Sequence, residues 1–407
     1  MSMKKDRSNR EKRRRRRLKN QFFAYLALIV IIALILAAGS LGVKAVIRYV
    51  NNYNDKVNRV IEEAESGVIT EQESQTFDIQ EEQSSIEYNE GYTSPNEGDP
   101  LENLVESLLN DMTIEEMVAG MFIVTPESIT GVETVVQASE GTKTALAANP
   151  VGGFVYAAKN FKSSEQFTEM LVNTKNYSKY PLFKAVIAEC GTTDYGLTAT
   201  PKASELSDAD SVTQAYASIA SVLASYGVDM DIAPSVFGDA ACTNAAVQAV
   251  QGAKVSAVLR SFPGDAAASK TLDELQGGEF AMYDAAIKSG VDCIMVSHVQ
   301  ASGLTGDDDM PSSLSSVVIQ DVLRDTLDFR GVVMTDALDD SAITNSYSSA
   351  EAAVAAVQAG ADLLLSPEVY QEAYEGVLQA VTDGTITKER IRESMYRIYR
   401  VKYKNTL

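Results

Sequence analysis

Between residues 101 and 407 the chain alternates short apolar runs with longer amphipathic segments, and this alternation limits its possible folds more than any other feature. Eight β/α units in about 300 residues match the number and size of a (β/α)8 (TIM) barrel. An open doubly wound sheet is the alternative, but no G-x-G-x-x-G motif follows the first run. The strands are expected at Met121–Val124, Gly152–Tyr156, Lys184–Ala188, Val228–Ile232, Ala257–Phe262, Asp292–Val296, Gly331–Met334 and Ala361–Leu365.

The segments between these runs have the spacing of helices with one apolar face. Thr113 and Glu116 form a capping box, which predicts that a helix begins there. The basic segment Thr387–Tyr403 is expected to form a helix that closes the outer layer of the barrel, with a membrane-surface helix as the alternative. Further helices are predicted at Ser164–Lys175, Ser211–Tyr226, Gly278–Ser289, Ser315–Leu327, Ser349–Ala359 and Val369–Thr382.

An uncharged apolar run, Gln21–Val43, precedes the barrel and is long enough to cross a membrane as a helix. Basic residues lie directly before it, so the positive-inside rule places residues 1–20 in the cytoplasm and the barrel outside. A cleaved signal peptide, cut near Ala37–Ser40, is the alternative to this single-pass anchor. Residues 44–100 are expected to form a juxtamembrane helix and a flexible acidic spacer, and residues 101–407 the barrel domain.

The charge of the chain is unevenly distributed. Residues 1–50 hold 13 Lys or Arg and two Asp or Glu, so residues 51–407 carry −32 of the total net charge of −21. An acidic body of this size repels nucleic acid, and the basic residues at the front are explained by membrane topology. We therefore expect no nucleic-acid partner and a cell-membrane location.

The stretch FRGVVMTDAL, Phe329–Leu338, joins a buried apolar run to a carboxylate, Asp336. Parallel barrels carry their chemistry at the carboxyl ends of their strands, so Asp336 is a candidate catalytic residue. A helix N-cap or turn aspartate is the alternative interpretation of the same pattern.

Cysteine and histidine are sparse. Cys190, Cys242 and Cys293 have neither metal-ligand nor redox spacing, and His298 is the only histidine in the chain. We therefore expect no metal ion and no cofactor.

Seven stretches carry a recognisable pattern: MTIEEMVAGMFIV (Met112–Val124), NPVGGFVYAAKN (Asn149–Asn160), YGVDMDIAPS (Tyr226–Ser235), SFPGD (Ser261–Asp265), AAIKSGVDCIMVSHV (Ala285–Val299), PSSLSSVVIQDVLRDTLDFRGVVMTDAL (Pro311–Leu338) and AVQAGADLLLSP (Ala356–Pro367). In this order they resemble the N-terminal barrel of family 3 glycoside hydrolases, and especially the single-domain β-N-acetylhexosaminidases. The resemblance implies retaining hydrolysis of terminal β-N-acetylglucosamine from cell-wall glycans, so a carbohydrate partner is expected.

Several site residues follow from this resemblance. Asp336 matches the family's catalytic nucleophile, which attacks the anomeric carbon. His298 matches a position that lines the sugar pocket, with a histidine bonded within the barrel rim as the alternative. Glu189 and Arg260 are the remaining candidates for substrate binding.

Other positions depart from the family pattern. Asp265 stands where the family has its acid/base histidine, and Ala267 stands where it has that histidine's aspartate partner. Asp265 could protonate a leaving group only if its surroundings raised its pKa. The D-Q-E-G-G-R segment of the family reads IAECGT at residues 187–192, and Phe237 replaces a further sugar-binding aspartate.

Two functional hypotheses follow. The chain is either a working or weak β-N-acetylglucosaminidase with Asp336 as nucleophile and Asp265 or Glu189 as acid, or a degenerate, catalytically silent barrel that binds wall glycan or a protein partner. Barrel aldolases and phosphate-binding barrels are disfavoured, because no Lys ends the sixth strand and the last loops are acidic or contain Pro.

Overall fold

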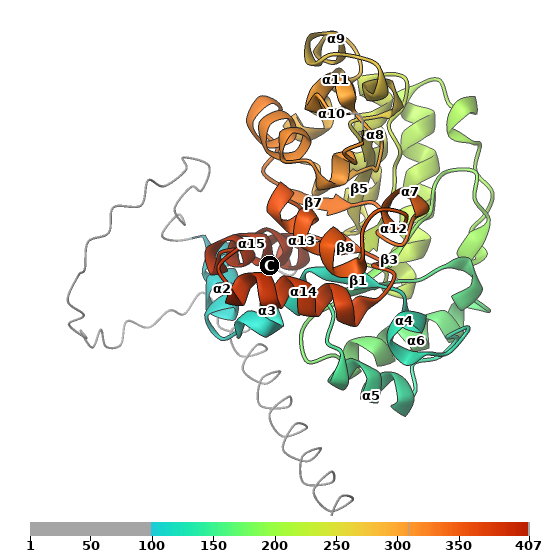
Figure 1. Cartoon of the computed structure of the whole chain (residues 1–407). Coiled ribbons are helices and arrows are strands. Elements are labelled where there is room, and N and C mark those ends of the chain that lie inside the picture. The colour runs from blue at the N-terminus through green and yellow to red at the C-terminus, as the bar shows by residue number, and fades with distance from the viewer. Residues whose placement is uncertain (1–98, 308, 406–407) are drawn as a thin grey trace, which may run out of the picture. The chain divides into compact units, whose positions relative to one another are not determined.

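The structure, a computed structural model, describes residues 99–307 and 309–405, and within them an eight-stranded parallel sheet in the order β7-β6-β5-β4-β3-β2-β1-β8. A bridge between Met334 and Leu363 joins the two ends of this order, so the sheet curves into a nearly closed barrel (Figure 1). The predicted (β/α)8 barrel is thereby confirmed. The strands are β1 (Phe122–Val124), β2 (Gly153–Val155), β3 (Phe183–Val186), β4 (Met230–Asp231), β5 (Ser256–Phe262), β6 (Cys293–Val296), β7 (Val332–Thr335) and β8 (Leu364–Leu365).

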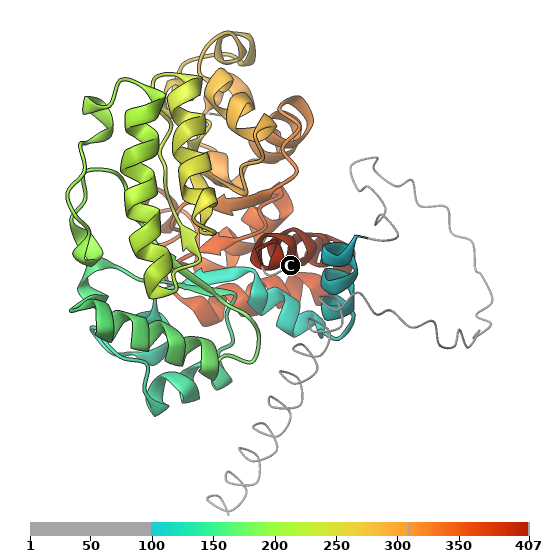
Figure 2. The same cartoon turned by 180° about the vertical axis from the view of Figure 1, so that it is seen from behind.

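Helices surround this sheet. In Figure 1, α13 and α14 lie side by side, and in Figure 2 the green α7 and yellow-green α8 do the same on the opposite face. The helices are α2 (Pro100–Asn110), α3 (Ile114–Gly120), α4 (Pro126–Thr130), α5 (Glu140–Ala148), α6 (Ser164–Tyr177), α7 (Ala209–Tyr226), α8 (Ala240–Gly252), α9 (Leu272–Gln276), α10 (Phe280–Lys288), α11 (Ser302–Thr305), α12 (Ser341–Thr344), α13 (Ser349–Ala359), α14 (Tyr370–Thr382) and α15 (Lys388–Tyr403).

Each predicted apolar run overlaps one strand, because the barrel interior and the helix layer bury both faces of every strand. The capping box is also confirmed: the Thr113 backbone N–H donates to Glu116 Oε2 over 2.9 Å, and the Glu116 N–H donates to Thr113 Oγ1 over 3.4 Å. The helices α2, α4, α5, α8, α9, α11 and α12 were not predicted, and neither was the π-helical form of residues 317–326. Helix α8 is built largely from Ala and other short side chains and shows little apolar contrast, and residues Val317–Thr326 form a π-helix.

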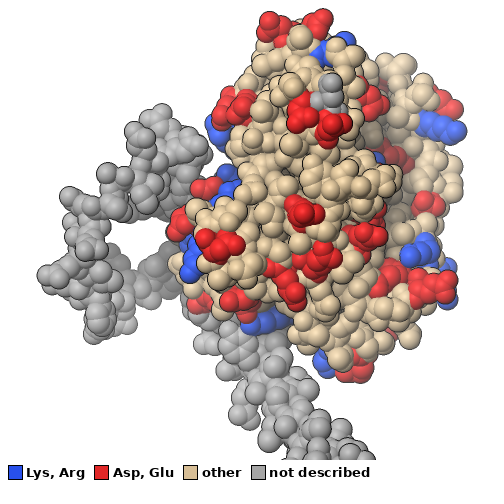
Figure 3. All heavy atoms as spheres, in the orientation of Figure 1, with Lys and Arg blue, Asp and Glu red and all other residues tan. Residues whose placement is uncertain are grey.

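The last helix, α15, contacts α2 and α3. It therefore belongs to the outer layer, as the sequence predicted. Acidic side chains are spread over much of the barrel face seen in Figure 3. Among the described residues no helix has both the length and the apolar composition of a membrane span, and the predicted span at residues 21–43 lies outside them.

A buried ion cluster lies at the start of the last strand. Asp362 is fully buried just before β8, and burial opposes its ionisation. Three guanidinium groups, Arg397 first, outweigh this effect and lower the pKa of Asp362 to about 2. Its oxygens accept bonds from Arg324 (2.7 Å), Arg397 (3.1 Å), Arg390 (3.4 Å), the Ser394 hydroxyl (2.7 Å) and the Val333 backbone N–H (3.0 Å).

We predict that Asp362→Asn destabilises the barrel by about 3–5 kcal/mol, because it leaves buried guanidinium groups without their counter-charge. Urea unfolding followed by circular dichroism measures this loss. The same change at Asp328, whose ion pair with Arg330 is exposed, is the matched control and should alter the free energy of unfolding by no more than about 1 kcal/mol. Equal losses in the two variants would contradict a structural role for the cluster.

The loss should depend on pH. The folded-state pKa of Asp362 lies below its unfolded value of about 3.9, so its stabilisation is complete above pH ~4 and disappears as the pH falls toward about 2. The difference between wild type and Asp362→Asn should therefore shrink across that acidic interval.

Candidate active site

Asp336 stands at the carboxyl end of β7, in a turn whose backbone is held by its neighbours. The Asp336 N–H donates to the Val296 carbonyl over 2.9 Å, and the Leu338 N–H donates to the Leu365 carbonyl over 2.8 Å. The half-buried Asp336 carboxylate accepts the Ala337 N–H through Oδ1 over 2.9 Å. This leaves Oδ2 for a reacting group at the barrel mouth.

His298 follows β6 and makes two hydrogen bonds within the barrel rim. Its Nδ1 lies 2.7 Å from Ser313 Oγ, and its Nε2 lies 2.9 Å from the Ala337 carbonyl oxygen. The only histidine of the chain therefore contacts the residue directly after Asp336.

Glu189 follows β3 and is fixed to the loop after β4. Its Oε1 accepts bonds from the Ser235 backbone N–H and from the Ser235 hydroxyl, each over 2.7 Å, and its Oε2 accepts the hydroxyl of the buried Tyr216. Protein donors thus occupy both oxygens of Glu189. The same Tyr216 ring packs edge-on against Phe237, at 6.2 Å between centroids, so an apolar contact fills the position where the family pattern has an aspartate.

Asp231, at the end of β4, is fully buried and has one hydrogen bond, from the Ala188 N–H to Oδ1 over 2.9 Å. Its Oδ2 and the Nε of Arg260 are buried atoms that find no hydrogen-bond partner among the described residues. Burial raises the pKa of Asp231 well above its usual range; the Glu189 carboxylate acts in the same direction, and Arg260 opposes it. The carboxyl of Asp231 therefore holds its proton to a higher pH than an exposed aspartate does.

Asp265 lies in the loop after β5, at the start of a short 3-10 helix, and is exposed. Ala267, in the same turn, is buried. The surroundings of Asp265 thus lack the burial that turns a carboxylate into a proton donor near neutral pH.

A second group of carboxylates lies beyond β7 and β8. Burial, followed by the charges of Asp340, Glu368 and Asp336, raises the pKa of Asp339. The mouth of the barrel is therefore strongly acidic beside the candidate nucleophile. Among the described residues, no group of three or more His, Cys, Asp or Glu side chains is arranged to hold a metal ion.

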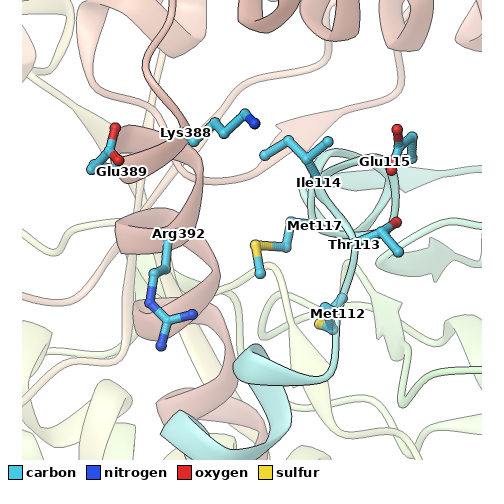
Figure 4. A pocket seen from close by; sticks show the side chains of 8 residues that line it. All are labelled: Met112, Thr113, Ile114, Glu115, Met117, Lys388, Glu389 and Arg392. Atoms are coloured by element: carbon cyan, nitrogen blue, oxygen red, sulfur yellow. The ribbon is translucent and has the colours of Figure 1, made fainter. Parts of the chain in front are cut away.

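A groove of about 430 Å³ lies elsewhere, between the beginnings of α3 and α15 (Figure 4). Met112, Ile114 and Met117 form its apolar side, and Lys388 and Arg392 lie across from them. None of the candidate site residues line this groove, so the barrel mouth remains the better candidate for the active site.

The structure joins His298 to Ala337, the residue after Asp336, and Glu189 to Ser235, and it places Asp265 in the loop after β5. Sequence reasoning missed Asp231, Tyr216 and Ser313 as site residues. Asp231 had a usable signal, because it is a carboxylate inside the predicted strand Val228–Ile232. Tyr216 lies within a helix pattern and Ser313 within a serine-rich stretch, and neither has a local signal.

Part of the chain matches a known protein family in sequence. Residues 238–401 match the model of the Glycosyl hydrolase family 3 N terminal domain. A β-hexosaminidase of Xanthomonas axonopodis pv. citri is 27% identical over 270 residues, which are 56% of this chain and 80% of that protein. A β-N-acetylglucosaminidase/β-glucosidase of Cellulomonas fimi is 27% identical over 190 residues, 41% of this chain, and the match spans only 34% of that protein.

The solved structures agree with this family. A glycoside hydrolase family 3 β-N-acetylglucosaminidase from Paenibacillus sp. str. FPU-7 has a TM-score of 0.65 and 28% identity. The match covers 72% of this chain and 62% of that one, so the chain spans less than two thirds of that enzyme. The barrel resembles the family's N-terminal barrel in both sequence and shape.

We predict that Asp231→Asn stabilises the protein increasingly as the pH rises above the unfolded pKa of about 3.9. The folded-state pKa of Asp231 is raised, so above that pH the folded protein holds the proton more tightly than the unfolded chain, and the wild type loses stability as the pH rises. Asparagine stays neutral and still accepts the Ala188 N–H. Its advantage at pH 8 should reach about 1–3 kcal/mol, or at least ~2 °C in Tm.

Thermal unfolding at several pH values measures this effect. The same substitution at the exposed Asp325 is the control and should show no pH-dependent difference from wild type. A pH-independent or negative effect of Asp231→Asn would contradict a raised pKa of Asp231.

Proposed function

We propose that this chain, of which residues 238–401 match the glycosyl hydrolase family 3 N-terminal domain, is a membrane-anchored, extracytoplasmic protein of the β-N-acetylhexosaminidase type whose hydrolytic activity is weak or lost. Its ligand would be a β-N-acetylglucosamine unit of cell-wall glycan. The names of the Xanthomonas and Paenibacillus relatives support this sugar class.

The hydrogen bonds that hold the turn of Asp336 are the main support for the proposal. Retaining hydrolysis requires a carboxylate that attacks the anomeric carbon from a fixed position and forms a covalent glycosyl intermediate. The backbone bonds on both sides of Asp336 supply that fixed position, and Oδ2 faces no donor from its own turn. Asp336 therefore has the geometry of the nucleophile.

The proton donor is the missing component. The leaving oxygen needs a proton in the same step, and a general acid typically contributes about 10²- to 10⁴-fold. Asp265 is exposed, and both oxygens of Glu189 already accept bonds from protein donors, so neither is arranged as a buried acid. These two observations favour strongly reduced activity.

The sugar contacts are reduced as well. Phe237 packs on Tyr216 where the family pattern has a polar residue, and Glu189 is shared with Ser235. Each lost polar contact lowers binding by about 1–3 kcal/mol, so we expect weaker recognition of the sugar than in the relatives. Arg260, Glu189 and His298 remain as the groups that would line the bound sugar.

A second function is favoured by the same loss of the acid: a silent barrel that binds wall glycan, or a protein partner, without cleaving it. The two functions share the fold and the location and differ only in turnover. Rebuilding the proton donor separates them.

We predict that the double variant Asp265→His/Ala267→Asp raises the release of chromophore from a chromogenic β-N-acetylglucosaminide by about 10²-fold or more over the wild type. The histidine would protonate the leaving oxygen, and the new aspartate would orient it. The assay uses the full-length chain, and initial rates from about pH 4 to pH 8 give kcat and KM.

Asp336→Asn in the rebuilt background is the control, and it should return the rate to that of buffer. Ala267→Asp alone should leave the rate within about twofold of the wild type, since it supplies no donor. An unchanged rate in the double variant would support the silent barrel. Turnover that survives Asp336→Asn would exclude Asp336 as nucleophile.

The anchor makes a separate prediction. If residues 21–43 span the membrane, the chain stays in the membrane pellet after alkaline carbonate extraction, and protease added to intact cells removes the barrel. Deleting residues 21–43 should prevent export and leave the barrel protected inside the cell. Release of a shortened, soluble chain from untreated cells would instead indicate a cleaved signal peptide.

A further inference from the structure

The single histidine connects two loops at the mouth of the barrel. His298 comes from the loop after β6, and both of its ring nitrogens face protein atoms rather than the open mouth. We infer that His298 is a positioning residue for Asp336 and acts through the backbone of Ala337. The inference rests on the proposed function, in which Asp336 is the nucleophile.

The chemistry of the two partners determines where the imidazole proton lies. The Ala337 carbonyl oxygen only accepts hydrogen bonds, so Nε2, at 2.9 Å, must carry the proton and donate it. In the neutral ring Nδ1 then accepts, and the Ser313 hydroxyl at 2.7 Å donates to it. The two contacts together specify one neutral tautomer.

Ser313 is well placed to maintain this tautomer. Its side chain is fully buried, and its backbone N–H donates to the Ser297 carbonyl over 3.0 Å, next to His298 in the chain. A buried hydroxyl needs a partner for its proton, and Nδ1 is the acceptor within reach. The chain of donors thus runs from Ser313 through His298 to Ala337.

The peptide group that receives this chain is held from both sides. His298 binds the carbonyl of Ala337, and the N–H of the same peptide, on Leu338, donates to the Leu365 carbonyl over 2.8 Å. The preceding Ala337 N–H donates to Asp336 Oδ1 over 2.9 Å. A shift of the Ala337 peptide would therefore move the carboxylate of Asp336 with it.

The two hydrogen bonds of His298 limit what its ring can contact at the barrel mouth. With Nδ1 and Nε2 both occupied, the ring can offer a sugar only its carbon atoms and its face, so its polar groups act on the nucleophile turn instead. Displacing a reacting group by about 1 Å can lower a rate about 10²-fold. His298 should thus affect kcat more than KM.

The first test compares turnover by the full-length chain and three variants. His298→Phe fills the space without the hydrogen bonds and should lower kcat by about 10²-fold while KM changes less than about twofold. His298→Gln restores a donor and an acceptor, and its kcat should be at least about tenfold higher than that of His298→Phe. Ser312→Ala is the matched control: its hydroxyl is equally buried but donates to the Val299 carbonyl over 2.6 Å, so kcat should stay within about twofold.

The second test needs no turnover. Because the chain contains one histidine, ¹⁵N-histidine labelling yields one imidazole, and long-range ¹H–¹⁵N correlation at neutral pH should show the proton on Nε2. Ser313→Ala should shift the ring toward a mixture of tautomers. Hydrogen–deuterium exchange of a peptide spanning residues 335–338 should be faster in His298→Phe and unchanged in Ser312→Ala.

The outcomes distinguish the positioning role from the proposed function. A proton on Nδ1, or unchanged exchange of residues 335–338 in His298→Phe, would overturn the positioning role. A higher KM with unchanged kcat in His298→Phe would also overturn it, because it would mean that His298 contacts the sugar. A wild type without any turnover would leave the silent barrel as the function, and the positioning role would then be decided by the tautomer and the exchange rates.

Discussion

The two ends of the sheet meet at β7 and β8, and this seam depends on one buried carboxylate, Asp362. It binds Arg324 from the π-helix before β7 and two arginines of α15, and it also accepts the backbone N–H of Val333 in β7. The seam itself is short, because β8 has two residues and a single bridge joins Met334 to Leu363. Disrupting a charge that is buried with its partners costs several kcal/mol, so this cluster stabilises a strand pairing that is weak by itself.

At the other end of the same seam lies the turn of Asp336, whose neighbour Leu338 donates to Leu365 just after the bridge. The ion cluster and the candidate nucleophile thus depend on the same two strands.

This arrangement indicates which of the candidate site positions the stability of the barrel depends on. The groups that fix Asp336 are backbone amides, a buried serine and a histidine bonded on both sides, and removing any of them leaves an unpaired polar group inside the protein. The positions that depart from the family pattern differ in this respect. Asp265 is exposed, and Ala267 and Phe237 fit into apolar surroundings, so these residues are compatible with a stable fold. Stability therefore constrains the turn of Asp336 more strongly than the exposed position of Asp265.

The same contrast separates what the sequence predicts from what it does not. Apolar runs such as Val332–Thr335 reveal their strands because burial on both faces leaves no polar position, and a carboxylate directly after such a run marks the barrel mouth. Helix α8 was missed because its many alanines give little contrast between faces, and the π-helix at Val317–Thr326 differs from an α-helix only in its bonding. The partners of Glu189 and His298 were also beyond prediction. Tyr216 and Ser313 lie 27 and 15 residues away from them, and only the closure of the barrel brings these loops together.

The bracing of Asp336 has a consequence for how activity could have been reduced. Catalysis by a retaining glycosidase needs a positioned nucleophile and a proton for the leaving group, and these contributions come from different loops. Here the first loop, after β7, is tied to β6 and β8, whereas the second, after β5, ends in an exposed aspartate. Burial, followed by the charges of Asp340, Glu368 and Asp336, raises the pKa of Asp339 beside the turn of Asp336. Additional negative charge opposes the approach of an anionic ligand and does not deliver a proton. The two loops therefore differ in how firmly they hold their carboxylates: backbone bonds fix the turn of Asp336, whereas Asp265 is exposed.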